Sequence, residues 1–176
     1  MMKSGSKAKD VAIVGLMIAV IEAAKLALAQ LPNIELTSFF IIIFTLYFGK
    51  KIFIAIPAFI LIEIMIFGFN LMWVLAYVYV WPILFLLTLL FSKFKSAFAM
   101  SILSGFFGLG FGFLCSFPYL FISTSQNPDA GLASAITYWI AGIPFDLIHG
   151  ISNFIIMLVL FAPVSRILEK SGLSKE

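Results

Sequence analysis

Charge is scarce in this sequence. Only 11% of its 176 residues are charged, whereas 63% are hydrophobic and the mean hydropathy is +1.17. An average soluble domain carries roughly 25% charged residues. A soluble core of this size cannot bury so much apolar surface, so lipid is the expected solvent for most of the chain.

Cysteine and nucleotide-binding motifs are also scarce. The single Cys115 lies in an apolar stretch, which excludes an internal disulfide and a cysteine metal site. The sequence has no GxxxxGK[ST] loop, no HExxH pair and no GxSxG elbow. We therefore expect no catalytic residue, no metal and no cofactor. Gly105, Gly108 and Gly112 lack the strand and turn of a dinucleotide site, so they predict close helix packing instead.

Apolar runs separated by turn signals predict one domain, residues 1–176, built as a single bundle of six transmembrane helices. At about 20 residues per span the chain has room for little else. The expected helices cover approximately residues 10–29, 34–48, 52–67, 71–91, 97–122 and 133–160.

The ends of the predicted helices follow from capping and turn residues. Asp10 is a good cap for the first helix. Residues 123–129 predict the only long polar loop, and Pro163 is expected to end the last helix and leave a short basic tail over 163–176.

Basic residues predict the orientation of this bundle. Ten of the eleven Lys and Arg residues fall at the amino terminus, the second and fourth connections and the carboxyl tail. They are Lys3, Lys7, Lys9, Lys50, Lys51, Lys93, Lys95, Arg166, Lys170 and Lys175. Short basic loops stay on the cytoplasmic side of a membrane. The expected fold class is therefore an all-α integral membrane protein with both termini in the cytoplasm, and no nucleic-acid partner is predicted.

Five ionisable residues nevertheless fall inside the predicted helices. A charged side chain at a helix centre costs roughly 2.5–3.5 kcal/mol on insertion scales. Such residues are expected to face the bundle interior and to mark a site. They are Glu22, Lys25, Glu63, Asp146 and His149.

Two polar and aromatic helix faces accompany these residues, and together they predict a pocket that opens to the outer side. Side chains spaced by three, four or seven residues share one face of a helix. Aromatic walls with few polar groups suit a small ligand with flat or hydrophobic parts. The candidate ligand-binding residues are Glu63, Asn70, Trp73, Tyr77, Trp81, Trp139, Asp146 and His149.

Structural interpretations of the same residues stay open at this point. Aromatic residues gather at membrane interfaces, and ionisable residues three apart on a helix can pair. The alternatives are an interfacial position for Trp73, a hydrogen-bonded pair for Asp146 and His149, a mutually neutralising pair for Glu22 and Lys25, and a solvated helix end for Glu35.

A stripe of small residues occupies one face of the first predicted helix. Gly15, Ala19, Ala23 and Ala27 recur every four residues. Small side chains let helix backbones approach closely in lipid. The stripe predicts close packing, either inside the bundle or against a partner.

Three longer strings carry a resemblance to a known family. They are LPNIEL at 31–36, YVWP at 79–82 and WIAGIPFDLIHG at 139–150. With six helices, cytoplasmic ends and the small-residue stripe, the whole chain resembles the substrate-binding S components of energy-coupling factor (ECF) vitamin transporters. The strings are similar to the branch that includes cobalamin-specific members.

The resemblance implies a function and partners. An S component in the plasma membrane of a prokaryote binds a vitamin from outside, here cobalamin or a related one. It docks on a transmembrane coupling protein that carries two cytoplasmic ATPases. The resemblance places the docking contact at Gly15, Ala19 and Ala23, with a glycine at one small position. It places the pocket among the fourth to sixth helices and the outer loops.

Two other functions remain as alternatives. The chain could be an autonomous proton-coupled transporter or channel that acts as an oligomer, with Glu63, Asp146 and His149 as a proton relay. An intramembrane enzyme that uses Asp146 and His149 is disfavoured, because no nucleophile or metal set accompanies them.

Overall fold

The computed structural model describes residues 4–127 and 129–173, and every element in this part of the chain is helical. The elements are α1 (Ser4–Ala27), α2 (Thr37–Phe48), α3 (Lys51–Phe67), α4 (Leu71–Phe91), the short 3₁₀ turn η1 (Ser92–Phe94), α5 (Ala97–Leu109), α6 (Phe111–Gln126) and α7 (Ala130–Lys170). The predicted all-α class is confirmed. Three stretches, Leu71–Phe94, Ala97–Gln126 and Ala130–Lys170, are long and apolar enough to cross a membrane.

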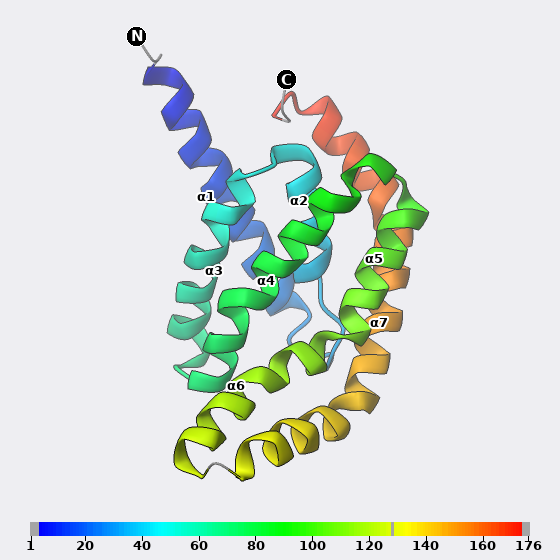
Figure 1. Cartoon of the computed structure of the whole chain (residues 1–176). Coiled ribbons are helices and arrows are strands. Elements are labelled where there is room, and N and C mark those ends of the chain that lie inside the picture. The colour runs from blue at the N-terminus through cyan, green and yellow to red at the C-terminus, as the bar shows by residue number, and fades with distance from the viewer. Residues whose placement is uncertain (1–3, 128, 174–176) are drawn as a thin grey trace.

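Helix α2 lies at the centre of the bundle (Figure 1). Ile41, Ile42 and Ile43 have no exposed surface, although successive residues of a helix point in directions about 100° apart. A helix that is apolar all round is buried on every side. Because α2 has 12 residues, it is only about 18 Å long. The segment 28–36 that connects α1 to α2, hereafter the linker, therefore begins within the length of the bundle; residues 29–32 are exposed, and residues 33–36 are half-buried against it.

The predicted helix over 97–122 is wrong as a single element. The chain breaks at Gly110 into α5 and α6, and α6 leaves the direction of α5 and runs across the lower end of α4 (Figure 1). Glycine lacks a Cβ and favours such a change of direction inside an apolar run. Since α6 continues to Gln126, most of the predicted polar loop at 123–129 is helical; Pro128 lies outside the described residues.

Two predicted helix ends are also wrong. Pro163 does not end the last helix, because α7 runs without interruption from Ala130 to Lys170 and contains both Pro144 and Pro163. A proline removes one backbone hydrogen bond, which a long packed helix can absorb as a bend. At the other end α1 begins at Ser4, and Asp10 pairs with Lys51 (2.6 Å) instead of capping the helix.

Close glycine contacts hold α5 against α7, as the glycine spacing predicts. A Cβ on Gly108 would lie 2.8 Å from the Cα of Gly150, and one on Gly105 would lie 3.3 Å from the carbonyl oxygen of Gly150. The two backbones touch at these positions, so the helices can approach only while no side chain intervenes.

We expect Gly108→Ala to destabilise the protein by about 1–3 kcal/mol, because the added methyl group must separate two packed backbones. The measurement is thermal unfolding in detergent, followed by circular dichroism. The matched control is Gly142→Ala on α7, where an added Cβ meets nothing within 4 Å. An equal melting temperature for the two variants would contradict the close packing.

The helices place both ends of the described chain at one end of the bundle (Figure 1). The α2–α3 and α4–α5 connections lie at the same end. This end carries Lys7, Lys9, Lys50, Lys51, Lys93, Lys95, Arg166 and Lys170. Lys3 and Lys175 lie outside the described residues. We call it the basic end.

Candidate functional site

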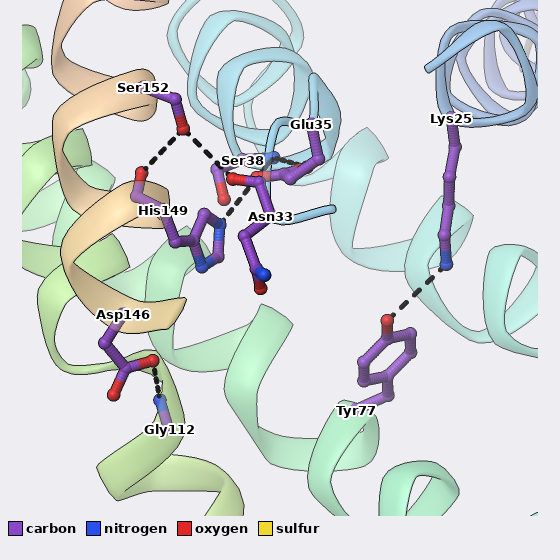
Figure 2. Close-up of polar contacts among 9 residues, drawn as sticks. All are labelled: Lys25, Asn33, Glu35, Ser38, Tyr77, Gly112, Asp146, His149 and Ser152. Atoms are coloured by element: carbon purple, nitrogen blue, oxygen red, sulfur yellow. Dashed lines mark hydrogen bonds and ion pairs between the residues drawn. The ribbon is translucent and has the colours of Figure 1, made fainter. Parts of the chain in front are cut away.

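A pocket of about 250 Å³ opens where the linker enters the bundle. The linker forms one side, and α1, α4, α6 and α7 supply the other walls. Its chemically distinctive residues are Lys25, Asn33, Glu35, Tyr77, Trp81 and His149. We call this cavity the linker pocket; Figure 2 shows the polar contacts around it.

Glu35 joins the linker to two helices. Its carboxylate lies 3.1 Å from Nε2 of His149 on α7 and accepts hydrogen bonds from the backbone N–H of Ser38 at 3.0 and 3.2 Å (Figure 2). It thereby caps the first turn of α2, which favours a negative group. Burial opposes ionisation of Glu35, but the contacts with His149, Ser38 and Thr37 outweigh it and lower the pKa of this carboxyl to about 2. Glu35 is therefore an ionised part of the pocket, and its interpretation as an ordinary solvated residue is wrong.

A second contact fixes the turn before Glu35. The hydroxyl of Ser152 on α7 donates to the carbonyl oxygen of Asn33 at 3.1 Å. Asn33 has a φ of 60°, which asparagine adopts more readily than most residues. The linker is thus held to α7 through Glu35 and Asn33. The side chain of Asn33 lies next to the His149 and Glu35 pair, below it in the view of Figure 2.

An aromatic wall faces this linker. Ring centroids lie 5.2 Å apart for Tyr77 and Trp81, 5.6 Å for Trp81 and Phe111, and 4.8 Å for Phe111 and His149. The rings are inclined at 46–73°, and tilted or edge-to-face contacts of this kind are favourable. The wall therefore connects α4 through α6 to α7 and gives the pocket a preformed flat surface.

Lys25 brings a positive charge to the pocket. Its ammonium group donates to Glu63 on α3 and lies 3.5 Å from the hydroxyl of Tyr77. Lys25 does not pair with Glu22, so the predicted pair within α1 is wrong. Glu22 is buried, and neither of its carboxylate oxygens has a hydrogen-bond donor among the described residues. The partner of Lys25 comes from another helix, 38 residues away.

The predicted site residues divide into three groups. Tyr77, Trp81 and His149 line the linker pocket. Glu63 and Trp73 do not line the pocket themselves but contact residues that do. Glu63 accepts a hydrogen bond from Lys25, and the ring of Trp73 packs edge-on against that of Tyr77, with ring centroids 5.0 Å apart. The remaining residues, Asn70, Trp139 and Asp146, do not line it.

The residues outside the pocket have structural contacts. Asn70 caps α4 by accepting from the backbone N–H groups of Met72 and Trp73 at 3.0 and 3.3 Å. Trp139 is 38% exposed and packs on Phe113, with ring centroids 5.1 Å apart.

Asp146 holds α6 against α7. It does not bond to His149, so the predicted pair is wrong; its carboxylate accepts the backbone N–H of Gly112 at 2.9 Å (Figure 2). Gly112 is in the first turn of α6, where N–H groups have no partner within the helix. A Cβ on Gly112 would collide with the Asp146 carboxylate. The absence of a side chain at Gly112 therefore leaves room for Asp146 of α7 to cap the amino end of α6.

We expect Asp146→Ala to lower the melting temperature by roughly 3–10 °C, because it leaves the buried N–H of Gly112 without an acceptor. Asp146→Asn keeps an acceptor oxygen and should lose less. Thermal unfolding of the three proteins measures the effect. A melting temperature for Asp146→Ala equal to wild type would show that this contact contributes nothing.

The small-residue stripe of α1 faces outward. Gly15, Ala19 and Ala23 are exposed, as is Ala27, and a Cβ on Gly15 would meet nothing within 4 Å. The stripe therefore serves no packing inside the described bundle, and the internal alternative is wrong. The residues that line α1's buried side are different ones, such as Ile13, Met17 and Ile21.

The described residues contain no cluster of three or more His, Cys, Asp or Glu side chains that could hold a metal ion. The pocket chemistry consists of the Lys25–Glu63 ion pair, the hydrogen-bonded Glu35 and His149, an amide and an aromatic wall, which suits binding of an organic molecule. Comparison with known protein families, curated proteins and solved structures finds no match to this chain.

Proposed function

We propose that this chain is the substrate-capture subunit of an ATP-driven vitamin importer, an S component of the ECF type. In this proposal all six helical passes cross the plasma membrane of a prokaryote, with α5 and α6 forming one pass, and the basic end faces the cytoplasm. The observation that carries the proposal is the linker pocket. Its linker connects helices on the side opposite the basic end, so the pocket is reached from outside the cell.

The chemistry of the pocket supports capture of a small organic molecule. It combines an aromatic wall with the Glu35–His149 and Lys25–Glu63 pairs. Charged groups inside a membrane protein are expensive and mark functional sites. Since the linker is tied to α7 through only a few polar contacts, it can move aside for entry and close over a bound ligand.

The size of the pocket favours a small vitamin. Its volume of about 250 Å³ lies below the range of roughly 300–1,000 Å³ that is typical of drug-sized ligands. A molecule of one or two rings fits such a space. Cobalamin, with its corrin ring, is far larger and would require the linker to leave the pocket.

The exposed stripe supports the proposed partners. In this proposal Gly15, Ala19 and Ala23 contact a helix of the transmembrane coupling protein, which carries the two ATPases. Unpartnered small residues on a lipid-facing helix allow close approach of another helix. The importer then draws its energy from those ATPases.

The contacts of the ionisable residues support capture over a proton relay. Glu63 bonds to Lys25, His149 to Glu35, and Asp146 to the backbone of α6. The three groups thus have three separate partners and form no continuous chain. An autonomous proton-coupled transporter would need such a chain across the bundle.

The first experiment identifies the ligand. Mass spectrometry of the molecule that co-purifies with the protein, followed by calorimetric titration with a panel of vitamins, should give tight binding of one vitamin by the isolated chain. Vesicles that contain this chain alone should show no uptake. Uptake driven by an ion gradient in those vesicles would overturn the proposal.

A further inference from the structure

A second cavity lies between α4, α5 and α6. Helices α4 and α5 diverge from their connection at η1, and α6 crosses from the end of α5 to the far end of α4 (Figure 1). The space between the three helices measures about 620 Å³. Every side chain that lines it is apolar, including those of Ile83, Leu87, Phe94 and Leu114. We call it the α4–α6 groove.

The length of the groove matches one leaflet of a bilayer. It extends from Phe94 in η1, past the whole of α5, to Leu114 in α6. With 13 residues, α5 is about 20 Å long. One leaflet of the hydrocarbon core is about 15 Å thick. Helix α6 closes the end of the groove that lies away from η1. A partner helix that crosses the full hydrocarbon core of about 30 Å therefore cannot lie along the groove, whereas an acyl chain from one leaflet can.

The open end of the groove is positively charged. Lys93 lies next to Phe94 there and forms no salt bridge among the described residues, whereas the ammonium group of Lys95 lies over the ring of Tyr47 on α2, 3.6 Å from its centroid. No Asp or Glu occurs between Glu63 and Asp129. The amino end of α5 adds the partial positive charge of its first N–H groups. These charges are complementary to a phosphate at the membrane surface.

We propose that the α4–α6 groove binds one acyl chain of an anionic phospholipid, with the lipid phosphate held by Lys93 and the amino end of α5. The proposal requires only that the chain lies in a membrane and does not depend on the vitamin or the coupling partner. A basic pocket between helices on the cytoplasmic side is a recurrent kind of site for anionic lipid headgroups. The lipid would fill the space between α4 and α5 and fix their separation.

The test is native mass spectrometry of the detergent-purified protein with phosphatidylglycerol and phosphatidylcholine that carry identical acyl chains. Wild type should retain phosphatidylglycerol preferentially. The variant Lys93→Gln should bind it roughly fivefold more weakly, because a lysine at a membrane surface contributes about that factor. Its retention of phosphatidylcholine should not change.

Two variants of α4 test the groove itself. Ile83→Trp should fill the groove and displace both lipids, whereas Val78→Trp, on the same helix but lining the cavity between α3 and α4, should displace neither from this site. An excess of inorganic phosphate should leave lipid binding intact. Far-ultraviolet circular dichroism verifies folding, and Leu87→Trp replaces Ile83→Trp if that variant misfolds.

Four results would overturn the proposal. Three of them are equal retention of the two lipids by wild type, unchanged phosphatidylglycerol affinity in the Lys93→Gln variant, and unchanged retention in a folded groove-filling variant. Displacement of the lipid by inorganic phosphate would also do so, since the acyl chain would then contribute nothing.

Discussion

Glu35→Gln should lower the affinity of the isolated protein for its vitamin by about ten- to a hundredfold. The substitution removes the charge opposite His149 and weakens the cap on α2, so that the linker is no longer held over the pocket. A hydrogen bond to a charged group contributes about 1.5–3 kcal/mol, which corresponds to this change in affinity. Calorimetric titration of the purified variant measures it.

Asp129→Asn is the matched control for Glu35→Gln. Asp129 is an exposed carboxylate in the α6–α7 connection, which lies on the same side of the bundle as the linker. Its removal changes the net charge equally but leaves the linker pocket intact. If Glu35→Gln binds the vitamin as tightly as Asp129→Asn does, the pocket described here is not the binding site.

Ala19→Leu should weaken docking on the coupling protein while vitamin binding survives. The added side chain projects from the exposed stripe and would hold the two helices apart. Overpacking of a close contact costs about 1–3 kcal/mol, so we expect recovery of the coupling complex to fall on the order of tenfold or more. Affinity pull-down of the co-expressed complex is the measurement.

Ala162→Leu provides the corresponding control. Ala162 is an exposed alanine on α7 and lies outside the stripe. The same increase in size there should leave the complex intact. Equal recovery of the complex with Ala19→Leu and wild type would show that the partner contacts another face.

The general architecture could be predicted from the sequence because it depends on local properties. Apolar runs and turn residues place the helices expected over 34–48, 52–67 and 71–91 within three residues of α2, α3 and α4, and the spacing of Lys50, Lys51, Lys93 and Lys95 predicts which connections share one end. The glycine spacing in α5 likewise predicts the tight contact with α7, since close approach of helices requires small residues wherever the partner lies.

Helix continuity was harder to predict. The apolar run continues through Gly110, and the stretch also contains Gly105, Gly108 and Gly112, so the glycines alone do not predict at which residue the direction changes. Pro163 predicts the end of a helix, but α7 continues through it, since packing of α7 compensates for one lost backbone hydrogen bond. In both cases tertiary packing decides between conformations that the local sequence allows.

The partners of the buried charges could not be predicted from spacing. Periodicity on a helix finds neighbours three or four residues away, and it therefore paired Lys25 with Glu22 and Asp146 with His149. In the structure Lys25 bonds to Glu63, Asp146 to the backbone of Gly112, and His149 to a residue 114 positions away.

Glu35 was missed as a site residue for the same reason. It lies outside the apolar runs, where a carboxylate is normally solvated. A signal was nevertheless present, because α2 is too short to carry its preceding linker beyond the bundle. A carboxylate at the end of that linker, next to the first turn of α2, is therefore half-buried and finds a partner on a neighbouring helix.

The central claim is that the linker pocket is reached from outside the cell and holds the ligand. Because Cys115 is the only cysteine, Cys115→Ala gives a background for labelling a single introduced thiol at Asn33→Cys in the linker. A membrane-impermeant maleimide added to intact cells should label that thiol, and the cognate vitamin should protect it. Labelling only after the cells are permeabilised, or labelling that the bound vitamin leaves unchanged, would contradict the account.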